Sequence, residues 1–148
     1  MKWRRDETVV IGCGNELRGD DGVGPYVVRR LRRLGIPAIG VHQLTPELAG
    51  LLAGARGAVF IDAAANLNPG EIAVTRPRPG GRGVFEHHWG PSALLGLTEQ
   101  AYRRSPRAIA LGIGGKSFEL GRALSRPARR AAASVAATIA ERILPESR

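Results

Sequence analysis

The apolar residues of the chain fall into short runs that follow two different periods. Five runs are rich in β-branched or small apolar residues and are bounded by glycine, proline or acids, which predicts strands over residues 8–12, 38–43, 58–64, 70–77 and 108–115. Four other segments repeat apolar residues at helical spacing, which predicts helices over residues 22–34, 45–55, 91–102 and 125–143. The predicted order is therefore β-α-β-α-β-β-α-β-α.

This alternation of strands and helices favours an α/β fold with three layers. We expect a twisted, mostly parallel five-stranded sheet with helices on both faces, because the third strand opens with an unbroken apolar run. The fourth strand follows the turn sequence NLNPG, so it can run antiparallel to its neighbour. The 148 residues contain no linker, repeat or low-complexity tract, and we expect a single domain over residues 1–148.

The charge balance is strongly basic, with a formal net charge of +9. The chain has 22 basic residues, and all of them are arginines except Lys2 and Lys116. Such a surplus can indicate an acidic partner such as nucleic acid. The arginines are spread along the chain, mostly on the polar faces of predicted helices. We interpret them as solvated helix faces and expect no nucleic-acid site.

Cysteine usage and hydropathy indicate the compartment. Cys13 is the only cysteine, so neither an intrachain disulfide nor a thiolate cluster can form, which fits a reducing environment. The first residues contain no long apolar run, and the run 131–140 is too short to span a bilayer. We expect a cytoplasmic monomer that makes no membrane contact.

Two glycine-rich segments resemble nucleotide-binding motifs but depart from them. Residues 12–14 read Gly-Cys-Gly, yet Leu17 stands where the dinucleotide fingerprint requires its third glycine. Residues 110–117 end in Gly-Lys-Ser, yet Ala110 stands where a phosphate loop requires glycine. We therefore expect neither segment to bind a nucleotide.

Acidic residues stand at the ends of two predicted strands. Asp21, the second acid of the pair Asp20–Asp21, follows the first strand, and Asp62 ends the apolar part of the third. In a flavodoxin-like order 2-1-3 these strands are neighbours, so both carboxylates meet at the crevice outside the strand ends. The loop before the third helix carries His87 and His88 and can reach the same edge. Two carboxylates and an imidazole suit a divalent transition metal such as nickel, zinc or manganese.

Each of these residues also has a simpler interpretation. Asp21 can cap the following helix, since acids favour helix N-termini, and Asp62 can cap a turn. The adjacent histidines can be exposed loop residues, and Cys13 can be a small residue in a tight turn. Spacing alone leaves these alternatives open.

Several segments resemble the hydrogenase maturation proteases. That family opens with the pattern G-x-G-N, a short spacer, an acidic pair and a glycine, which matches residues 9–31, VVIGCGNELRGDDGVGPYVVRRL. The similarity continues through residues 42–64, 87–115 and 118–125, and so covers nearly the whole chain. The resemblance implies a metal-dependent endopeptidase that removes the C-terminal extension of a nickel-containing hydrogenase large subunit after nickel insertion. The partner would be that large-subunit precursor.

The family's metal-contacting residues are an acid in the opening motif, an acid ending the third strand and a histidine before a later helix. Carried over by motif, these positions fall on Asp21, Asp62 and His87, which would serve as both metal-contacting and catalytic residues. His87 is preferred to His88 because its spacing to Gly90 matches the family better. The metal would be nickel carried by the substrate, or another divalent metal.

The resemblance also implies roles for the loop glycines. Gly12, Gly14 and Asn15 would shape the opening loop, and Gly22 and Gly24 would let the following helix approach closely. Two alternatives stay open: a non-catalytic α/β module that binds a metal or another ligand, and a protease of the same fold with another protein substrate.

Overall fold

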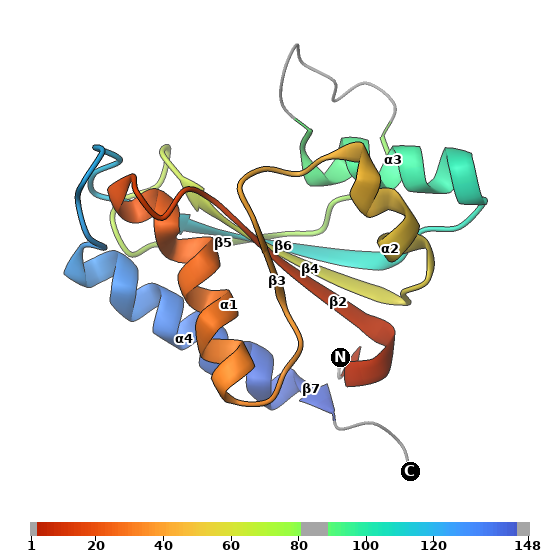
Figure 1. Ribbon diagram of the computed structural model, residues 1–148, viewed down its shortest axis with the longest axis horizontal. Helices are drawn as coiled ribbons and strands as arrows, with labels where there is room; N and C mark the ends of the chain where they lie inside the picture. Colours follow the sequence, from red (N-terminus) through yellow and green to blue (C-terminus); the bar gives the residue numbers. More distant parts are fainter. Residues whose placement is uncertain (1–2, 81–88, 145–148) are drawn as a thin grey trace.

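A five-stranded sheet lies between two layers of helices in the computed structural model, which describes residues 3–80 and 89–144 (Figure 1). The strands of this sheet are β2 (Thr8–Cys13), β3 (Ile39–Val41), β4 (Gly57–Ala64), β5 (Ile72–Thr75) and β6 (Arg107–Gly114). The helices are α1 (Val23–Arg33), α2 (Ala49–Ala53), α3 (Pro91–Tyr102) and α4 (Arg126–Arg142). This is the α/β architecture expected from the sequence.

The strand order is β3-β2-β4-β6-β5, in which β2, β3, β4 and β6 are parallel and β5 is antiparallel to β6. The first and third strands of the sheet in chain order, β2 and β4, are neighbours, which confirms the 2-1-3 order. The antiparallel fourth strand is confirmed as well. The register aligns Asp62 of β4 with Gly112 of β6, and Gly112 with Ala73 of β5.

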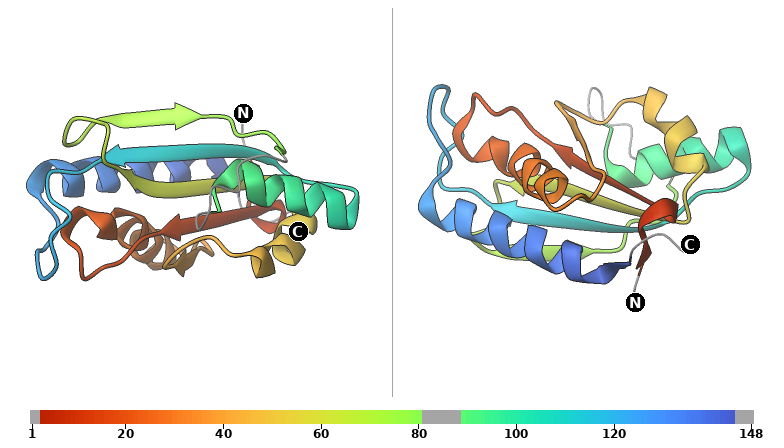
Figure 2. Two further views of the ribbon diagram at one scale, coloured as in Figure 1. Left: turned by 90° about the horizontal axis from the view of Figure 1, so that it is seen from above. Right: turned by 60° about the horizontal axis from the view of Figure 1, so that its bottom comes forward.

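Helices α1 and α4 cover one face of the sheet, and α2 and α3 cover the other (Figure 2). Each face has its own buried cluster, because successive residues of a strand point to opposite faces. In β4, Val59 and Ile61 pack in the cluster of α1 and α4, whereas Ala58 and Phe60 pack in the cluster of α2 and α3. Asp62 follows Phe60 on the α2–α3 face.

Two parts of the chain differ from the sequence-based expectation. The helix predicted over 45–55 is only a 3-10 turn, η3 (Pro46–Leu48), followed by the short α2, and Thr45 makes no side-chain cap. Gly50 and Gly54 lower the helix propensity of this segment. A second small sheet, absent from the prediction, pairs β1 (Trp3–Arg4) with β7 (Ile143–Leu144) in parallel.

The fold collects arginines that are scattered in the sequence. Helices α1 and α4 pack side by side, and the arginines on their outer sides are exposed: Arg29, Arg30, Arg32, Arg33, Arg126, Arg129, Arg130 and Arg142. Among residues 3–80 and 89–144, no helix has both the length and the hydropathy that a bilayer crossing requires.

Candidate functional site

Asp21 and Asp62 line the same cavity at the carboxyl ends of the parallel strands. The cavity has a volume of about 700 Å³. Asp21 reaches it from η2 (Gly19–Gly22), the turn between β2 and α1, and Asp62 reaches it from the end of β4. The structure therefore brings together the two carboxylates that the sequence predicted to meet, at the place where α/β sheets bind ligands.

Asp21 does not cap α1. The N-cap of this helix is Gly22, and no side chain makes a capping hydrogen bond there. Instead, the carboxylate of Asp21 accepts a hydrogen bond from the backbone N–H of Asn15 at 2.6 Å. This bond spans the opening loop and holds the half-buried carboxylate at the cavity. The simpler interpretation of Asp21 as a helix cap is thus wrong.

The carboxyl group of Asp62 has a raised pKa. Its Oδ1 accepts a hydrogen bond from the N–H of Ala63 at 2.8 Å. Asp62 is exposed to the open cavity, yet partial desolvation by the surrounding walls raises the pKa of its carboxyl group from 3.8 to about 6; the bond from Ala63 opposes this rise and the negative charge of Asp21 adds to it. Asp21 raises the pKa of Asp62 because the two carboxylates lie in the same cavity and repel each other.

Cys13 lines the same cavity as a buried, free thiol. Burial and, to a smaller extent, the charges of Asp62 and Asp21 together raise the pKa of Cys13 from 9.0 to about 12. The thiol therefore stays protonated at neutral pH and is a poor nucleophile or metal ligand. Cys13 is the last residue of β2 and pairs with Val41, so it lies at the end of a strand and not in a tight turn.

Asp20, the other member of the acidic pair, is buried and accepts hydrogen bonds from within the protein. This role was not predicted from the sequence. The side chain of Asp20 is 1% exposed. Oδ1 accepts from the N–H of Ser125 at 2.7 Å, and Oδ2 accepts from the hydroxyl of Ser125 at 2.7 Å and the N–H of Lys116 at 2.7 Å. The N–H of Ser117 lies 3.4 Å from Oδ2. Burial works to raise the pKa of Asp20, but these hydrogen bonds outweigh it and lower the pKa below 3.8.

These contacts explain the segment that resembles a phosphate loop. The backbone N–H groups of Lys116 and Ser117 do bind an anion, but the anion is the carboxylate of Asp20. Ser125 caps α4, since its side chain accepts a hydrogen bond from the N–H of Ala128. Asp20 thereby ties the opening loop to the start of α4.

The predicted histidines, His87 and His88, lie outside the described residues. The residues that follow them, Trp89, Gly90 and Pro91, line the carboxylate cavity at the start of α3. His42, just after β3, lines the cavity too. His42 was not predicted as a site residue, although its position directly after a strand that neighbours β2 could have indicated that it lines the cavity.

Over residues 3–80 and 89–144, no group of three or more histidine, cysteine, aspartate or glutamate side chains is placed to hold a metal ion. The described part of the chain thus places two carboxylates in the cavity, and the predicted histidines lie outside it.

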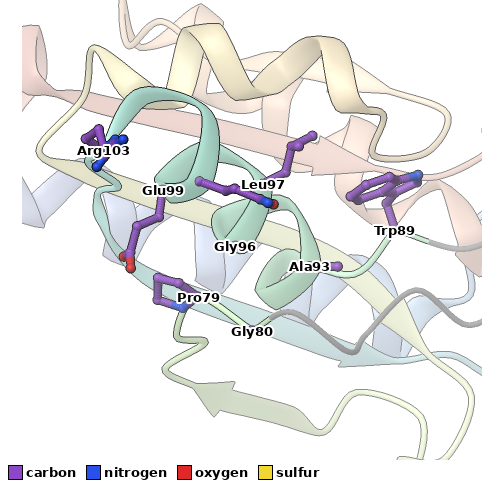
Figure 3. A pocket seen from close by; sticks show the side chains of 9 residues that line it. Pro79, Gly80, Trp89, Ala93, Gly96, Leu97, Glu99 and Arg103 are labelled. Carbon is purple, nitrogen blue, oxygen red and sulfur yellow. The ribbon is translucent and has the colours of Figure 1, made fainter.

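A second cavity of about 740 Å³ lies over α3. Figure 3 shows Trp89 at one end of it and Glu99 and Arg103 at the other, with Gly96 of α3 between them. Gly80 packs so closely on Gly96 that a methyl group at position 96 would overlap the backbone of residue 80. Because Trp89 lines both cavities, they adjoin at this side chain.

No protein-family model matches the sequence, and no curated protein matches it significantly. Solved structures do match. The NiFe hydrogenase maturation protease HycI from Thermococcus kodakarensis KOD1 has a TM-score of 0.74 and 24% identity, over 92% of this chain and 91% of that one. HybD from Thermococcus kodakarensis has a TM-score of 0.63 and 28% identity, over 91% of this chain and 97% of that one. The maturating endopeptidase HybD from E. coli has a TM-score of 0.67 and 20% identity, over 91% and 93%.

The fold of these hydrogenase maturation proteases extends over nearly the whole chain, which confirms the resemblance noted from the sequence.

Proposed function

We propose that this chain is an endopeptidase that removes the C-terminal extension of a nickel-containing hydrogenase large-subunit precursor after nickel insertion. The observation that carries the proposal is the meeting of Asp21 and Asp62 in one cavity, on a fold shared with proteins named as hydrogenase maturation proteases. The precursor is its partner, and nickel enters the site as part of that substrate.

The donor set fits a divalent transition metal. Carboxylate oxygens from Asp21 and Asp62, with an imidazole from His87, or from His88 as the alternative, are ligands that nickel, zinc and manganese accept. The pKa of Asp62 is raised mainly by desolvation and in smaller part by the charge of Asp21, and a cation between the two carboxylates would offset both effects. Held by these side chains, such a metal would polarise the scissile carbonyl or lower the pKa of a bound water.

The chain's own residues position the substrate and handle the proton. Asp21, fixed by the N–H of Asn15, presents its carboxylate at a defined place in the cavity. A carboxylate of the site that the metal leaves free accepts a proton from the attacking water, a role worth about 10²–10⁴ in rate. The thiol of Cys13 takes no part, because it stays protonated.

We place the reaction in the cytoplasm and expect a monomer. The single cysteine, Cys13, is buried and free, so the stability of the chain does not depend on an oxidising compartment. Sedimentation of the purified protein tests the oligomeric state.

The first prediction concerns processing of a nickel-loaded precursor by Asp21→Asn, Asp62→Asn and His87→Gln variants. Each substitution removes a charged oxygen or an imidazole from the site, so we expect cleavage to slow by at least about 10²-fold. The measurement is the rate at which mass spectrometry detects the shortened large subunit. His88→Gln, assayed in parallel, identifies which histidine acts.

Asp6→Asn is the matched control, since Asp6 lies in the 3-10 turn before β2 and its carboxylate pairs with Arg4 on the surface. It should cleave as the wild type does. Full cleavage by the Asp21, Asp62 and both histidine variants would remove the site assignment. Nickel binding by a wild-type protein that never shortens a precursor would instead indicate a binding module.

A further inference from the structure

The carboxylate cavity extends sideways from Asp62 towards the edge of the sheet. The register places Asp62, Gly112 and Ala73 in one row across β4, β6 and β5. All three side-chain positions face the cavity. Because neighbouring strands lie about 4.8 Å apart, the row runs roughly 10 Å from the catalytic edge to β5. Its floor beyond Asp62 consists of a glycine and an alanine.

The next row has the same character. Phe60 aligns with Ala110, and Ala110 with Thr75, and these residues line the cavity as well. Over β2 and β4 this face of the sheet is filled by large side chains, because Leu44 and Leu94 share a buried cluster with Phe60. Over β6 and β5 the floor is built from small residues, which leaves room beside Asp62.

Part of the wall beside this floor is apolar. A methyl group at position 112 would meet the Cβ of Ala64 at 3.4 Å and Cδ1 of Leu67 at 3.9 Å, which are ordinary van der Waals contacts. Residue 112 therefore has room for a side chain but does not carry one. Asp62 is the neighbour of Gly112 in the same row, and the neutral polar residues Asn66 and Thr75 also line the cavity.

We propose that this small-residue floor, formed by Gly112, Ala110 and Ala73, is a subsite for one apolar side chain of the precursor, from a residue that flanks the scissile bond. This inference rests on the proposed function, because it names the chemistry of the substrate residue that the same site accepts. An apolar side chain gains by leaving water for these walls. A neutral polar side chain of similar size would lose hydrogen bonds to water there.

The dimensions of the cavity indicate which residue of the precursor contacts the subsite. One residue of extended chain advances about 3.3 Å, and the floor begins at Gly112, one strand spacing of about 4.8 Å from Asp62. A peptide bond held beside Asp62 therefore places an adjacent side chain over Gly112, from where a side chain of leucine size extends towards Ala73. The subsite thus binds the side chain of the residue immediately before or after the bond that is cleaved.

The test is a size-swap experiment on purified protein and nickel-loaded precursors. Each residue flanking the scissile bond is changed to alanine, valine, leucine, phenylalanine or asparagine, and kcat/KM is measured. We expect the wild type to prefer a leucine over an alanine at one of the two positions by about tenfold or more, as hydrophobic pockets do. Asparagine at that position, which is similar in size to leucine, should be cleaved more slowly than leucine.

Two variants fill the subsite in steps. Ala73→Leu should abolish or reverse the preference for leucine over alanine. Gly112→Ala, which fits without overlap, should give an intermediate preference. The matched control is Val74→Leu, which enlarges the next residue of β5 on the opposite face of the sheet. It should keep the wild-type preference.

The possible outcomes separate the subsite from the proposed function. A wild type that cleaves the precursors with no side-chain preference, or an Ala73→Leu variant that folds normally and keeps the wild-type preference, overturns the subsite alone. So does an Ala73→Leu variant that loses activity equally on every precursor. A wild type that cleaves none of the precursors overturns the proposed function, and the subsite falls with it.

Discussion

Asp20 and Asp21 are adjacent in the sequence but serve different purposes. Asp21 faces the cavity, whereas Asp20 is buried and accepts hydrogen bonds from Lys116, Ser117 and Ser125. The sequence identified Asp21 through its place after a strand. The role of Asp20 was not predictable in the same way, because its partners lie 96 to 105 residues away along the chain.

The Asp20→Asn substitution should strongly destabilise the fold. An amide NH₂ would face the N–H donors that now share the carboxylate, leaving buried polar groups unpaired. We expect a loss of about 3 kcal/mol in the free energy of unfolding at pH 7, since each unpaired buried group costs about 1–3 kcal/mol. Urea unfolding measures the loss.

The difference between wild type and Asp20→Asn depends on pH in a defined direction. The folded state lowers the pKa of Asp20 below 3.8, so the carboxylate stabilises the fold fully above that pH. This contribution is lost as the pH falls through the folded-state pKa. The two proteins should therefore converge in stability at acidic pH. A constant difference down to the acid-unfolding range would contradict the role assigned to Asp20.

At the scale of elements, the connection between β2 and α1 depends on a close approach of two backbones. A Cβ at Gly24 of α1 would lie 2.6 Å from the backbone nitrogen of Cys13 and 2.9 Å from the carbonyl oxygen of Ile61. Helix α1 therefore packs directly on β2 and β4, and the tight turn between β2 and α1 delivers Asp21 to the cavity.

The Gly24→Ala substitution should disturb both the fold and the site. Backbone atoms cannot move aside as a flexible side chain can, so α1 has to shift away from the sheet. We expect a loss of about 2–3 kcal/mol in stability, as for other overpacked positions, together with slower precursor cleavage. Chemical denaturation and the processing assay measure the two effects.

Gly40→Ala in β3 is the matched control for this substitution. Its nearest neighbour would be Cγ1 of Val28 at 3.9 Å, an ordinary contact. We expect a change within about 0.5 kcal/mol. Equal stability of Gly24→Ala and Gly40→Ala would mean that the close approach of α1 is not needed.

Most elements of the sheet were predictable because their apolar runs are long or end at glycine. The strand at 58–64 and the helix at 91–102 match β4 and α3 within a residue. The prediction was wrong for the helix at 45–55, where Pro46 and two glycines limit α-helix to five residues. It also missed β1 and β7, since two-residue strands have no period to detect.

At the scale of the whole molecule, the sequence predicted a cavity with two carboxylates because strand order and strand ends determine where loops meet. It did not predict the arginine layer. The arginines of α1 and α4 are about a hundred residues apart in the chain, and only the packing of the two helices places them together. The sheet between them separates this layer from the cavity face carried by α2 and α3.

This charge distribution should make the stability depend on salt. The net charge is +9, and the ion pairs among the described residues are solvent-exposed, so each contributes little. Added salt screens the repulsion between arginines more than it weakens these pairs. We expect the Tm to rise between low and physiological NaCl, by roughly 2–4 °C for each kcal/mol of repulsion removed.

A variant that carries both Arg129→Gln and Arg130→Gln lowers the net charge by two on the exposed side of α4. Its Tm should rise less with salt than that of the wild type. A Tm that falls with salt in both proteins would show that the surface ion pairs outweigh the repulsion.

The pairing of β1 with β7 places one of the two tryptophans far from the other. Trp3 lies at the sheet end where the parallel strands begin, in register with Ile143 and against Gly57. Trp89 lies at the cavity, where those strands end. In a Trp89→Phe protein the tryptophan fluorescence therefore comes only from the β1–β7 pair, and in a Trp3→Phe protein only from the cavity. Fluorescence can thus follow the pairing of β1 with β7 and the binding of a peptide in the cavity as two separate signals.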